Sequence, residues 1–541
     1  MYVDYKQTLQ VLVEEVTYAK AVICKMENSD GEDQEYHIKD ISFSIICHND
    51  LMFSFDNSYL KSVVPDSDAT MLIRVWIANG SKVSRLDYCF GDISLHPGCL
   101  KTLIRSLLHK VITQAVKAYF QANKSDSRFY VKSDDPVEKF ISPIISFNQD
   151  FVSADLLKEY SKLSAQLYRL DCVEMVIVNF SKHQIITIMA DSEGREILDS
   201  KTFYATSVKL RCFNLQRFHL VVSHNQYYIN ENEARLDLGY FGKAIKDKVA
   251  HIATVAVAEA ADYPMMLSAN ATNVLFHEAL SGHLFSADLI VNGQANLFKG
   301  KQGKKLTESS LKYSVLNDLV IYVDPTEITK LGGYNFDAEG IRAQKTILID
   351  HGVVKNFLLS RNSAFRLEQF SNGHCRAEEF LAVSTYTRTV LPEARISHLV
   401  IKSDTGLSND ALRKKIVDYC LEHGYQAYLE VDAYAGEVDP DTTNFTLSMD
   451  LCHKVYLDGR EEWFYGGSLS GTPDHLLSSV LAFGSENLLS SGNCGSSSGW
   501  VPVSCDAPPL FMIGHYVPET LPQPDFLFNL ARDKYIPEDL P

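Results

Sequence analysis

Residues 445–467, FTLSMDLCHKVYLDGREEWFYGG, alternate apolar and polar side chains on both sides of Asp458-Gly459. An Asp-Gly pair between two alternating segments predicts a β-hairpin, because both residues accept the left-handed backbone of a tight turn. Residues 347–360, ILIDHGVVKNFLLS, repeat the pattern around an internal His-Gly pair. Short strands and turns of this kind prevail in the second half of the chain, and they predict a β-rich domain.

The first half of the chain combines helices with strands. Apolar residues recur at helical spacing over residues 101–120, and a second amphipathic helix is predicted after the N-cap Ser153. Strands are predicted over residues 172–180 and 184–191, joined by a short polar turn at residues 181–183. This alternation predicts an α/β domain.

These patterns together predict an α+β protein with two domains, which suits a chain of 541 residues. Residues 1–240 are expected to form the α/β domain. Residues 241–541 are expected to form the β-rich domain, as a barrel-like structure or as layered antiparallel sheets. One helix interrupts the later strands, between the N-cap Ser408 and a stop at Gly424.

The composition disfavours several classes of protein. Lys and Arg number 51 against 68 Asp and Glu, a formal charge of -17, so nucleic acid is disfavoured as the main partner. The eleven cysteines are scattered singly without a C-x-x-C pair, which is typical of a reducing cytoplasm. No secretory signal is visible, and the apolar stretches are shorter than the roughly 20 residues that span a bilayer. We therefore expect a cytoplasmic protein without membrane contact.

The strongest chemical signal is NVLFHEALSGHLFSADLI, residues 273–290, which holds His277, Glu278 and His283 in an apolar, helix-compatible frame. In zinc peptidase helices two histidines four residues apart bind one ion, and the glutamate beside the first acts as general base. Here the histidines are six residues apart, which on a regular α-helix separates them by about 120°. To share an ion, the backbone has to loosen around Gly282 through a π-bulge or a helix break. Ordinary structural roles for both histidines are the alternative.

A third metal ligand is absent from this segment. Cysteine thiolate is a good zinc ligand, and Cys494 lies in a flexible setting, Asn-Cys-Gly-Ser-Ser-Ser-Gly, that permits close approach to a metal. Spacing alone does not select Cys494 over the ten other cysteines. An inert role beside a tight turn is the alternative for this residue.

Several segments resemble those of the TldD/PmbA family and occur in the same order along the chain. Members of this family are described as modulators of DNA gyrase and include zinc metallopeptidases. HEALSGHLFSADLI resembles the family's HExxxH helix, and residues 493–510 resemble its late segment with a zinc-binding cysteine. Four further segments resemble intermediate parts of the family: residues 335–367, 372–378, 435–450 and 466–477. The resemblance is strong from about residue 265 to residue 515 and only general before that.

The resemblance implies a site and an assembly. It implies that His277, His283 and Cys494 bind Zn2+, and that Glu278 polarises the attacking water and transfers its proton. It also implies a homodimer, or a heterodimer with a family paralogue, whose cavity admits peptides or unfolded segments. A folded substrate is then expected to be poor.

His374 and Arg376 lie in one of the matching segments and are candidates for substrate binding, with a packing role as the alternative. The chain departs from the family in two ways. It has one residue more between His277 and His283, and Ser286 stands where an acidic residue is usual. The second departure removes a carboxylate that would hold the histidine or the metal.

The first hypothesis is therefore a zinc metallopeptidase that hydrolyses peptides or unfolded polypeptide segments. The alternative is a non-catalytic paralogue that acts as a partner subunit or a peptide-holding scaffold. The retained ligands and Glu278 favour the enzyme, whereas the extra residue and Ser286 favour the scaffold. A purely structural zinc requires a fourth protein ligand, and none is evident. The acidic balance gives no support for contact with DNA.

Overall fold

The computed structural model describes residues 3–22, 24–27, 33–79, 82–121, 137–145, 147, 153–215, 218–252, 254–256, 258–306, 314–379 and 391–519. Its helices are α1 Tyr5–Lys20, α2 Pro97–Gln121, α3 Ala154–Tyr168, α4 Glu231–Leu236, α5 Leu238–Ile252, α6 Ala269–Phe276, the π-helix η2 His277–Ser281, α7 Ala287–Val291, the short 3-10 helices η3 Asn296–Phe298 and η4 Ser314–Asp318, α8 Arg361–Arg366, α9 Asn409–His423 and α10 Pro473–Ser479.

The strands of the first half are β1 Cys24–Glu27, β2 Asp33–Asp56, β3 Tyr59–Asn79, β4 Lys82–Phe90, β5 Lys139–Ile141, β6 Val173–Asp191, β7 Glu196–Phe213 and β8 His219–Tyr228. Those of the second half are β9 Ala261–Leu267, β10 Leu319–Val323, β11 Thr346–Asp350, β12 Val353–Val354, β13 Cys375–Arg376, β14 Glu393–Ala394, β15 His398–Ser403, β16 Ala427–Val438, β17 Phe445–Tyr456, β18 Glu461–Tyr465, β19 Ser468–Gly471, β20 Val480–Phe483, β21 Leu488–Ser496, β22 Gly499–Ala507 and β23 Leu510–Tyr516.

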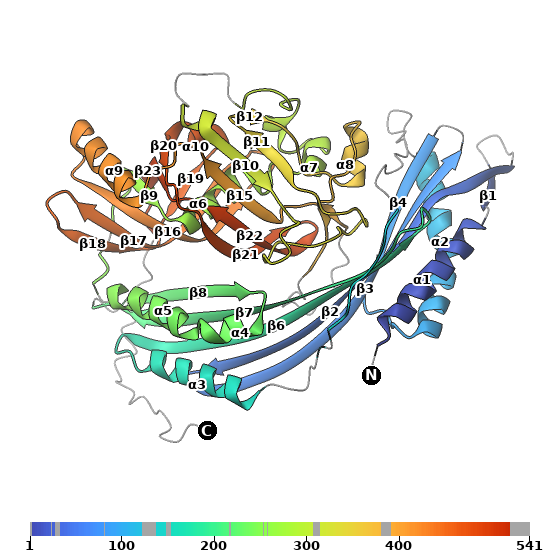
Figure 1. Ribbon diagram of the computed structural model, residues 1–541, viewed down its shortest axis with the longest axis horizontal. Helices are drawn as coiled ribbons and strands as arrows, with labels where there is room; N and C mark the ends of the chain where they lie inside the picture. Colours follow the sequence, from blue (N-terminus) through green and yellow to red (C-terminus); the bar gives the residue numbers. More distant parts are fainter. Residues whose placement is uncertain are drawn as a thin grey trace.

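The first half forms one long, curved sheet (Figure 1) with the strand order β4-β3-β2-β6-β7-β5, to which β1 is added at β2 and β8 at β7. Its neighbouring strands are antiparallel, apart from the parallel pair β5 and β7. The sheet is therefore built from long hairpins, with helices before, between and after them.

Helices cover one face of this sheet, because every second residue along the strands is apolar. Phe43, Ile45 and Phe53 of β2 are fully buried and share a face, since successive side chains in a strand point to opposite sides. Helices α1 and α2 pack over one half of that face, and α3 and α5 pack over the other half.

The opposite face of the sheet contacts the second half of the chain. Ile185 and Phe203 pack against Leu331, and Met189 packs against Phe336. The second half lies along this face in Figure 1. Burial of these side chains fixes the position of the second half on the first.

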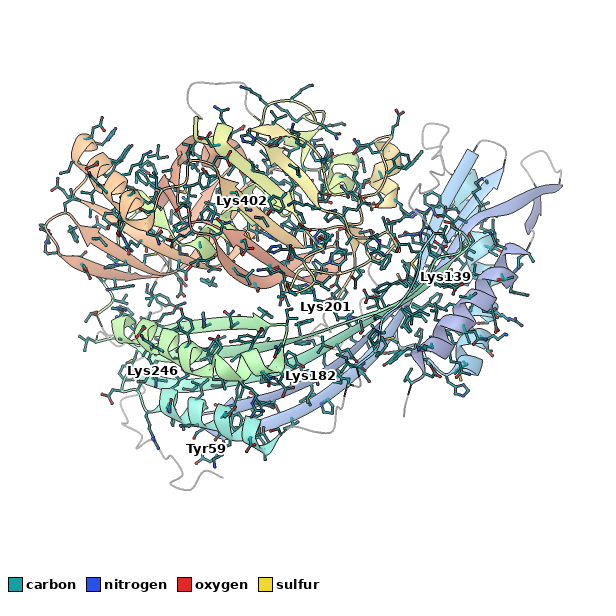
Figure 2. All side chains as sticks on the ribbon, viewed as in Figure 1. Tyr59, Lys139, Lys182, Lys201, Lys246 and Lys402 are labelled. Carbon is teal, nitrogen blue, oxygen red and sulfur yellow. The ribbon has the colours of Figure 1, made fainter. Side chains whose placement is uncertain are left out.

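Lys201 of β7 lies at this contact between the two halves (Figure 2). Its ammonium group donates to the carbonyls of Leu331 and Gly333, the latter at 2.8 Å. Burial lowers the pKa of Lys201 to about 7, so carbonyl contacts only partly replace the lost hydration of its charge.

The second half contains two larger sheets. One has the order β12-β11-β10-β15-β22-β21, and the other has the order β18-β17-β16-β9-β23-β20, with β19 added at β17. A single apolar core takes residues from both sheets and from α6, including Leu275 and Phe276. The predicted α+β class, with a β-rich second half built of layered sheets, is confirmed.

Both predicted turns are present. His351 and Gly352 connect β11 to β12 with positive φ angles of 51° and 74°. Asp458-Gly459 connects β17 to β18. The predicted helix is α9, which Ser408 caps through the Ala411 amide and which ends at Gly424.

The predicted turn at residues 181–183 is wrong, because β6 runs through it as a single strand. Ser181 and His183 pair with β2 on one side and β7 on the other. The His183 ring bonds the Ser181 hydroxyl at 2.8 Å and Asp50 at 2.9 Å. Because these polar side chains form hydrogen bonds within the sheet, they do not require a turn that exposes them to water.

The division of the chain at residue 240 stays a prediction. The first sheet ends with β8 at Tyr228, and the first strand of the second half begins at Ala261. Among the described helices, none is both long enough and apolar enough to cross a bilayer.

Buried charges also join the two halves. Arg74 of β3 donates to Asp87 at 2.8 Å and to Glu339, which in turn accepts the Arg361 amide at 2.5 Å. Burial raises the pKa of Glu339, but the guanidinium groups of Arg74, Arg85 and Arg361 outweigh it and lower that pKa. The carboxylate of Glu339 is therefore charged and fully enclosed by its partners.

We predict that Glu339→Gln lowers the free energy of unfolding by about 3 kcal/mol, because the substitution removes a buried negative charge that faces the guanidinium groups of Arg74, Arg85 and Arg361. Urea unfolding followed by fluorescence measures the change. The control is Glu14→Gln, since Glu14 pairs with Lys101 at the surface and its loss costs less than about 1 kcal/mol. Equal effects of the two substitutions would contradict a stabilising role for the buried network.

Candidate metal centre

The start of helix α6 is anchored to strand β16. The Ser268 hydroxyl accepts the Ala271 amide at 3.0 Å as N-cap and donates to Asp432 at 2.6 Å. The Asn270 amide group also donates to Asp432, at 3.0 Å. These bonds satisfy the free end of the helix and fix its position on the sheet.

The helix changes its hydrogen-bonding pattern where the motif begins. From His277 to Ser281 it is a π-helix, and the Gly282 N–H donates to the His277 carbonyl at 2.8 Å. This i→i+5 bond accommodates one more residue per turn than an α-helical bond does. The predicted loosening around Gly282 is confirmed, and the rings of His277 and His283 are 5.2 Å apart, centre to centre.

The position of Gly282 requires a residue without a side chain, but it does not require the unusual backbone angles of glycine. Its φ of -74° and ψ of -52° are helical values that any residue adopts. A Cβ atom would lie 2.4 Å from the His277 carbonyl oxygen and 2.7 Å from the His277 ring. The absence of a side chain at Gly282 therefore allows His277 to occupy its position.

Cys494 lies beside the two histidines. It belongs to β21, where it pairs with Val501 of β22, and α6 packs against both strands. The Cys494 Sγ is 3.2 Å from Nε2 of His277 and 3.5 Å from Nε2 of His283. The three donor atoms lie within 4.8 Å of one another, and the structure thus brings all three predicted ligands together.

The donor set fits a zinc ion. Zn–N distances of about 2.0 Å and Zn–S distances of about 2.3 Å place nitrogen and sulfur ligands roughly 3.5 Å apart around a tetrahedral ion. The two observed separations from sulfur, 3.2 and 3.5 Å, match this requirement. Two imidazoles and one thiolate also leave one of four tetrahedral positions for another molecule.

Electrostatics favour the thiolate form of Cys494. Burial raises the pKa of the thiol, but the charges of His283, Arg395 and His277 outweigh it and hold that pKa well below its usual range. Burial likewise lowers the pKa of His277, and the adjacent Cys494 thiolate reverses this and raises it to about 9. A thiolate is the form that binds a metal.

Glu278 projects toward the same cluster. Its Oε2 is 3.6 Å from Nε2 of His283, and its side chain is 12% exposed. Gly436 of β16 makes room for it, since a Cβ there would lie 2.5 Å from Cγ of Glu278. A carboxylate beside the donor cluster has the position that a general base requires.

Arg395 is a neighbour that the sequence did not reveal. Its guanidinium group donates to Sγ of Cys494 at 3.2 Å and to the Cys494 carbonyl at 2.7 Å. It is 99 residues away from Cys494 along the chain and belongs to no motif with recognisable spacing.

His374 and Arg376 are both buried. Nε2 of His374 contacts the Thr346 hydroxyl at 3.0 Å, and burial lowers the pKa of His374 to about 3. Arg376 forms two bonds with Glu379, at 2.7 and 2.8 Å, and lines a cavity together with Lys201. Neither contacts the three donor atoms, and their role in substrate binding stays a prediction.

Ser286, which replaces the family's acidic residue, is buried and precedes α7. The nearest following carboxylate is Asp288, and it does not turn toward His283. Its two oxygens accept the Ser360 hydroxyl and the Ala394 amide, both at 2.7 Å. The carboxylate after the motif therefore holds neighbouring backbone and not the histidine.

The fold and the site define an α+β protein with a His–His–Cys cluster, two of its members buried and one partly buried, that can hold a metal ion. Residues 260–512 match the PmbA/TldA metallopeptidase C-terminal domain, so this part of the chain is similar to the TldD/PmbA family. The predicted resemblance is thereby confirmed.

Curated relatives agree with this match. The chain is 29% identical over 274 residues to a metalloprotease of Methanothermobacter thermautotrophicus, covering 51% of this chain and 54% of the relative. It is 25% identical to a metalloprotease of Archaeoglobus fulgidus, covering 66% and 75%, and 24% identical to a zinc metalloprotease TldD homologue of Saccharolobus solfataricus, covering 48% and 53%. The first of these alignments thus spans about half of the relative's length. These names support a metallopeptidase family.

Solved structures share the fold over almost the whole chain. TldE from Thermococcus kodakarensis matches with a TM-score of 0.64 and 16% identity, covering 95% of this chain and 100% of that one. A protein from Thermotoga maritima that is described as a modulator of a DNA gyrase matches with a TM-score of 0.62 and 14% identity, covering 95% and 99%. At these identities the likeness concerns the fold alone.

We predict that Gly282→Ala weakens zinc binding by at least about 10-fold, because the added methyl group displaces the His277 carbonyl and ring. Competition with a chromogenic chelator measures the affinity. The matched control is Gly239→Ala in helix α5, where a Cβ meets nothing within 4 Å. Unchanged zinc affinity in the Gly282 variant would show that the π-helix tolerates a side chain and that His277 is not held as described.

Proposed function

We propose that the chain is a zinc-dependent metallopeptidase that hydrolyses peptides or unfolded polypeptide segments. The observation that carries the proposal is the convergence of His277, His283 and Cys494 on one point, with Glu278 beside them. The metalloprotease names of the relatives support the same reaction class.

His277, His283 and Cys494 would hold the ion, and their separations from sulfur suit zinc. When bound, zinc supplies Lewis-acid chemistry, which polarises a peptide carbonyl and lowers the pKa of water. A fourth ligand from the protein is absent among the described residues near the cluster. An open position suits catalysis better than a purely structural role.

Glu278 would carry the proton. In its charged form its carboxylate takes a proton from the attacking water, and the same oxygen then gives that proton to the leaving amine. Its partial exposure permits contact with water, and Gly436 leaves its side chain free of crowding from β16. The reaction proceeds without a covalent intermediate on the protein.

The proposal extends to the assembly of the protein and its location in the cell. We propose a homodimer, or a heterodimer with a family paralogue, and TldE among the structural matches supports such a pairing. The cysteines whose side chains the structure describes are all free thiols, which supports a reducing cytoplasm. A substrate in extended conformation is expected.

The first test is the metal content of protein purified without a chelator or a metal-binding tag. We expect about one zinc per chain, and its loss in His277→Ala and Cys494→Ser, because an alcohol is a far weaker ligand than a thiolate. Elemental analysis gives the stoichiometry. The control is Cys505→Ser, a buried cysteine of the adjacent strand that lies outside the cluster.

No metal in the wild-type protein, even after zinc is added, would overturn the proposal. That result would favour the alternative, a non-catalytic paralogue that serves as a partner subunit or peptide-holding scaffold. The extra residue in the motif and Ser286 are the features that support this alternative.

A second test separates the base from the ligands. We predict that Glu278→Gln keeps its zinc and lowers the hydrolysis of an unfolded protein or a fluorogenic peptide by about 100-fold or more, since only proton transfer is lost. The control is Glu437→Gln, an exposed glutamate on the same strand as Gly436. Normal turnover by the Glu278 variant would remove this residue from the mechanism.

A further inference from the structure

The guanidinium group of Arg395 lies inside the hairpin that carries Cys494. Nη2 donates to the Cys494 carbonyl at 2.7 Å and to its Sγ at 3.2 Å. Nη1 donates to the Ser498 hydroxyl at 2.6 Å and to the Gly499 carbonyl at 2.9 Å. One side chain thus joins the end of β21, the connecting turn and the start of β22.

The backbone of Arg395 and of the residue before it is also held by hydrogen bonds. Its backbone N–H donates to the His374 carbonyl at 2.8 Å. The preceding residue, Ala394, donates its N–H to Asp288 at 2.7 Å, and Asp288 lies five residues after His283. A continuous series of hydrogen bonds therefore leads from the histidine segment to the cysteine hairpin.

We infer that Arg395 is a positioning residue for the metal centre, which fixes the Cys494 sulfur in the orientation that faces His277 and His283. The inference rests on the proposed function, because it concerns the same cluster. Without Arg395 the sulfur loses the hydrogen bond that holds it, and nothing else on the described hairpin donates to it.

Two physical effects support this role. Arginine is always charged and presents several donors in a rigid plane, so one nitrogen of Arg395 bonds Cys494 while another bonds Ser498 and Gly499, a spread that the single nitrogen of a lysine does not cover. A hydrogen bond to a metal ligand orients it, and loss of such partners in metalloproteins typically weakens binding about 10- to 100-fold.

The test uses Arg395→Met and Arg395→Lys in the full chain. We expect zinc affinity to fall about 10- to 100-fold in the Met variant and less in the Lys variant, which keeps the charge but not the fork of donors. In the cobalt-substituted protein the thiolate-to-cobalt charge-transfer band is expected to move to longer wavelength in Arg395→Met, because the sulfur loses a hydrogen bond. Chelator competition and absorption spectroscopy measure the two effects.

The control is Arg195→Met, another buried arginine, which bonds Asp191 in the first sheet. It is expected to lower thermal stability and to leave both the affinity and the cobalt band unchanged. If Arg395→Met gives a folded protein with wild-type affinity and an unshifted band, the positioning role is wrong while the proposed function stands. If the wild-type protein binds neither zinc nor cobalt, the proposed function fails and this inference fails with it.

Discussion

A single backbone hydrogen bond, from the Gly282 N–H to the His277 carbonyl, determines whether the candidate site exists. Helix α6 is held between two sheets, since Ser268 bonds Asp432 of β16 and Asn273 bonds Ser490 of β21. It therefore does not rotate to suit its ligands. A regular α-helix would carry His283 about 120° away from His277. The π-helical turn removes that difference, and the absence of a side chain at Gly282 makes the turn possible.

The chemistry of the site depends on segments that are far apart in the chain. The histidines come from one helix, the thiolate from the β21–β22 hairpin, and the cation that faces the thiolate from the segment after β14. A buried thiolate without partners would be costly, because its charge has lost water. His277, His283 and Arg395 compensate for that loss, and they thereby favour the thiolate form of Cys494.

The sequence predicted those features whose cause is local. The turn at Asp458-Gly459 and the helix that ends at Gly424 follow from nearby residues, and both are present. Counting residues between the two histidines predicted a π-bulge or a helix break if they share an ion, and a π-helix is present. The failed turn at residues 181–183 had a nonlocal cause, since the polar side chains there find partners on neighbouring strands. Spacing did not distinguish Cys494 from other cysteines or identify Arg395, because their contacts form only after the sheets pack.

The same hydrogen bonds connect the site with the contact between the two halves of the chain. Glu339, which receives Arg74 from the first sheet, also accepts the Arg361 amide. The residue before Arg361 is Ser360, and its hydroxyl donates to Asp288, the carboxylate that holds the backbone next to Arg395. Each of these hydrogen bonds is short and buried. A shift of the first sheet against the second half of the chain therefore strains the hydrogen bonds that hold the backbone next to Arg395. The position of the cysteine sulfur therefore depends on the docking of the two halves as well as on its own hairpin.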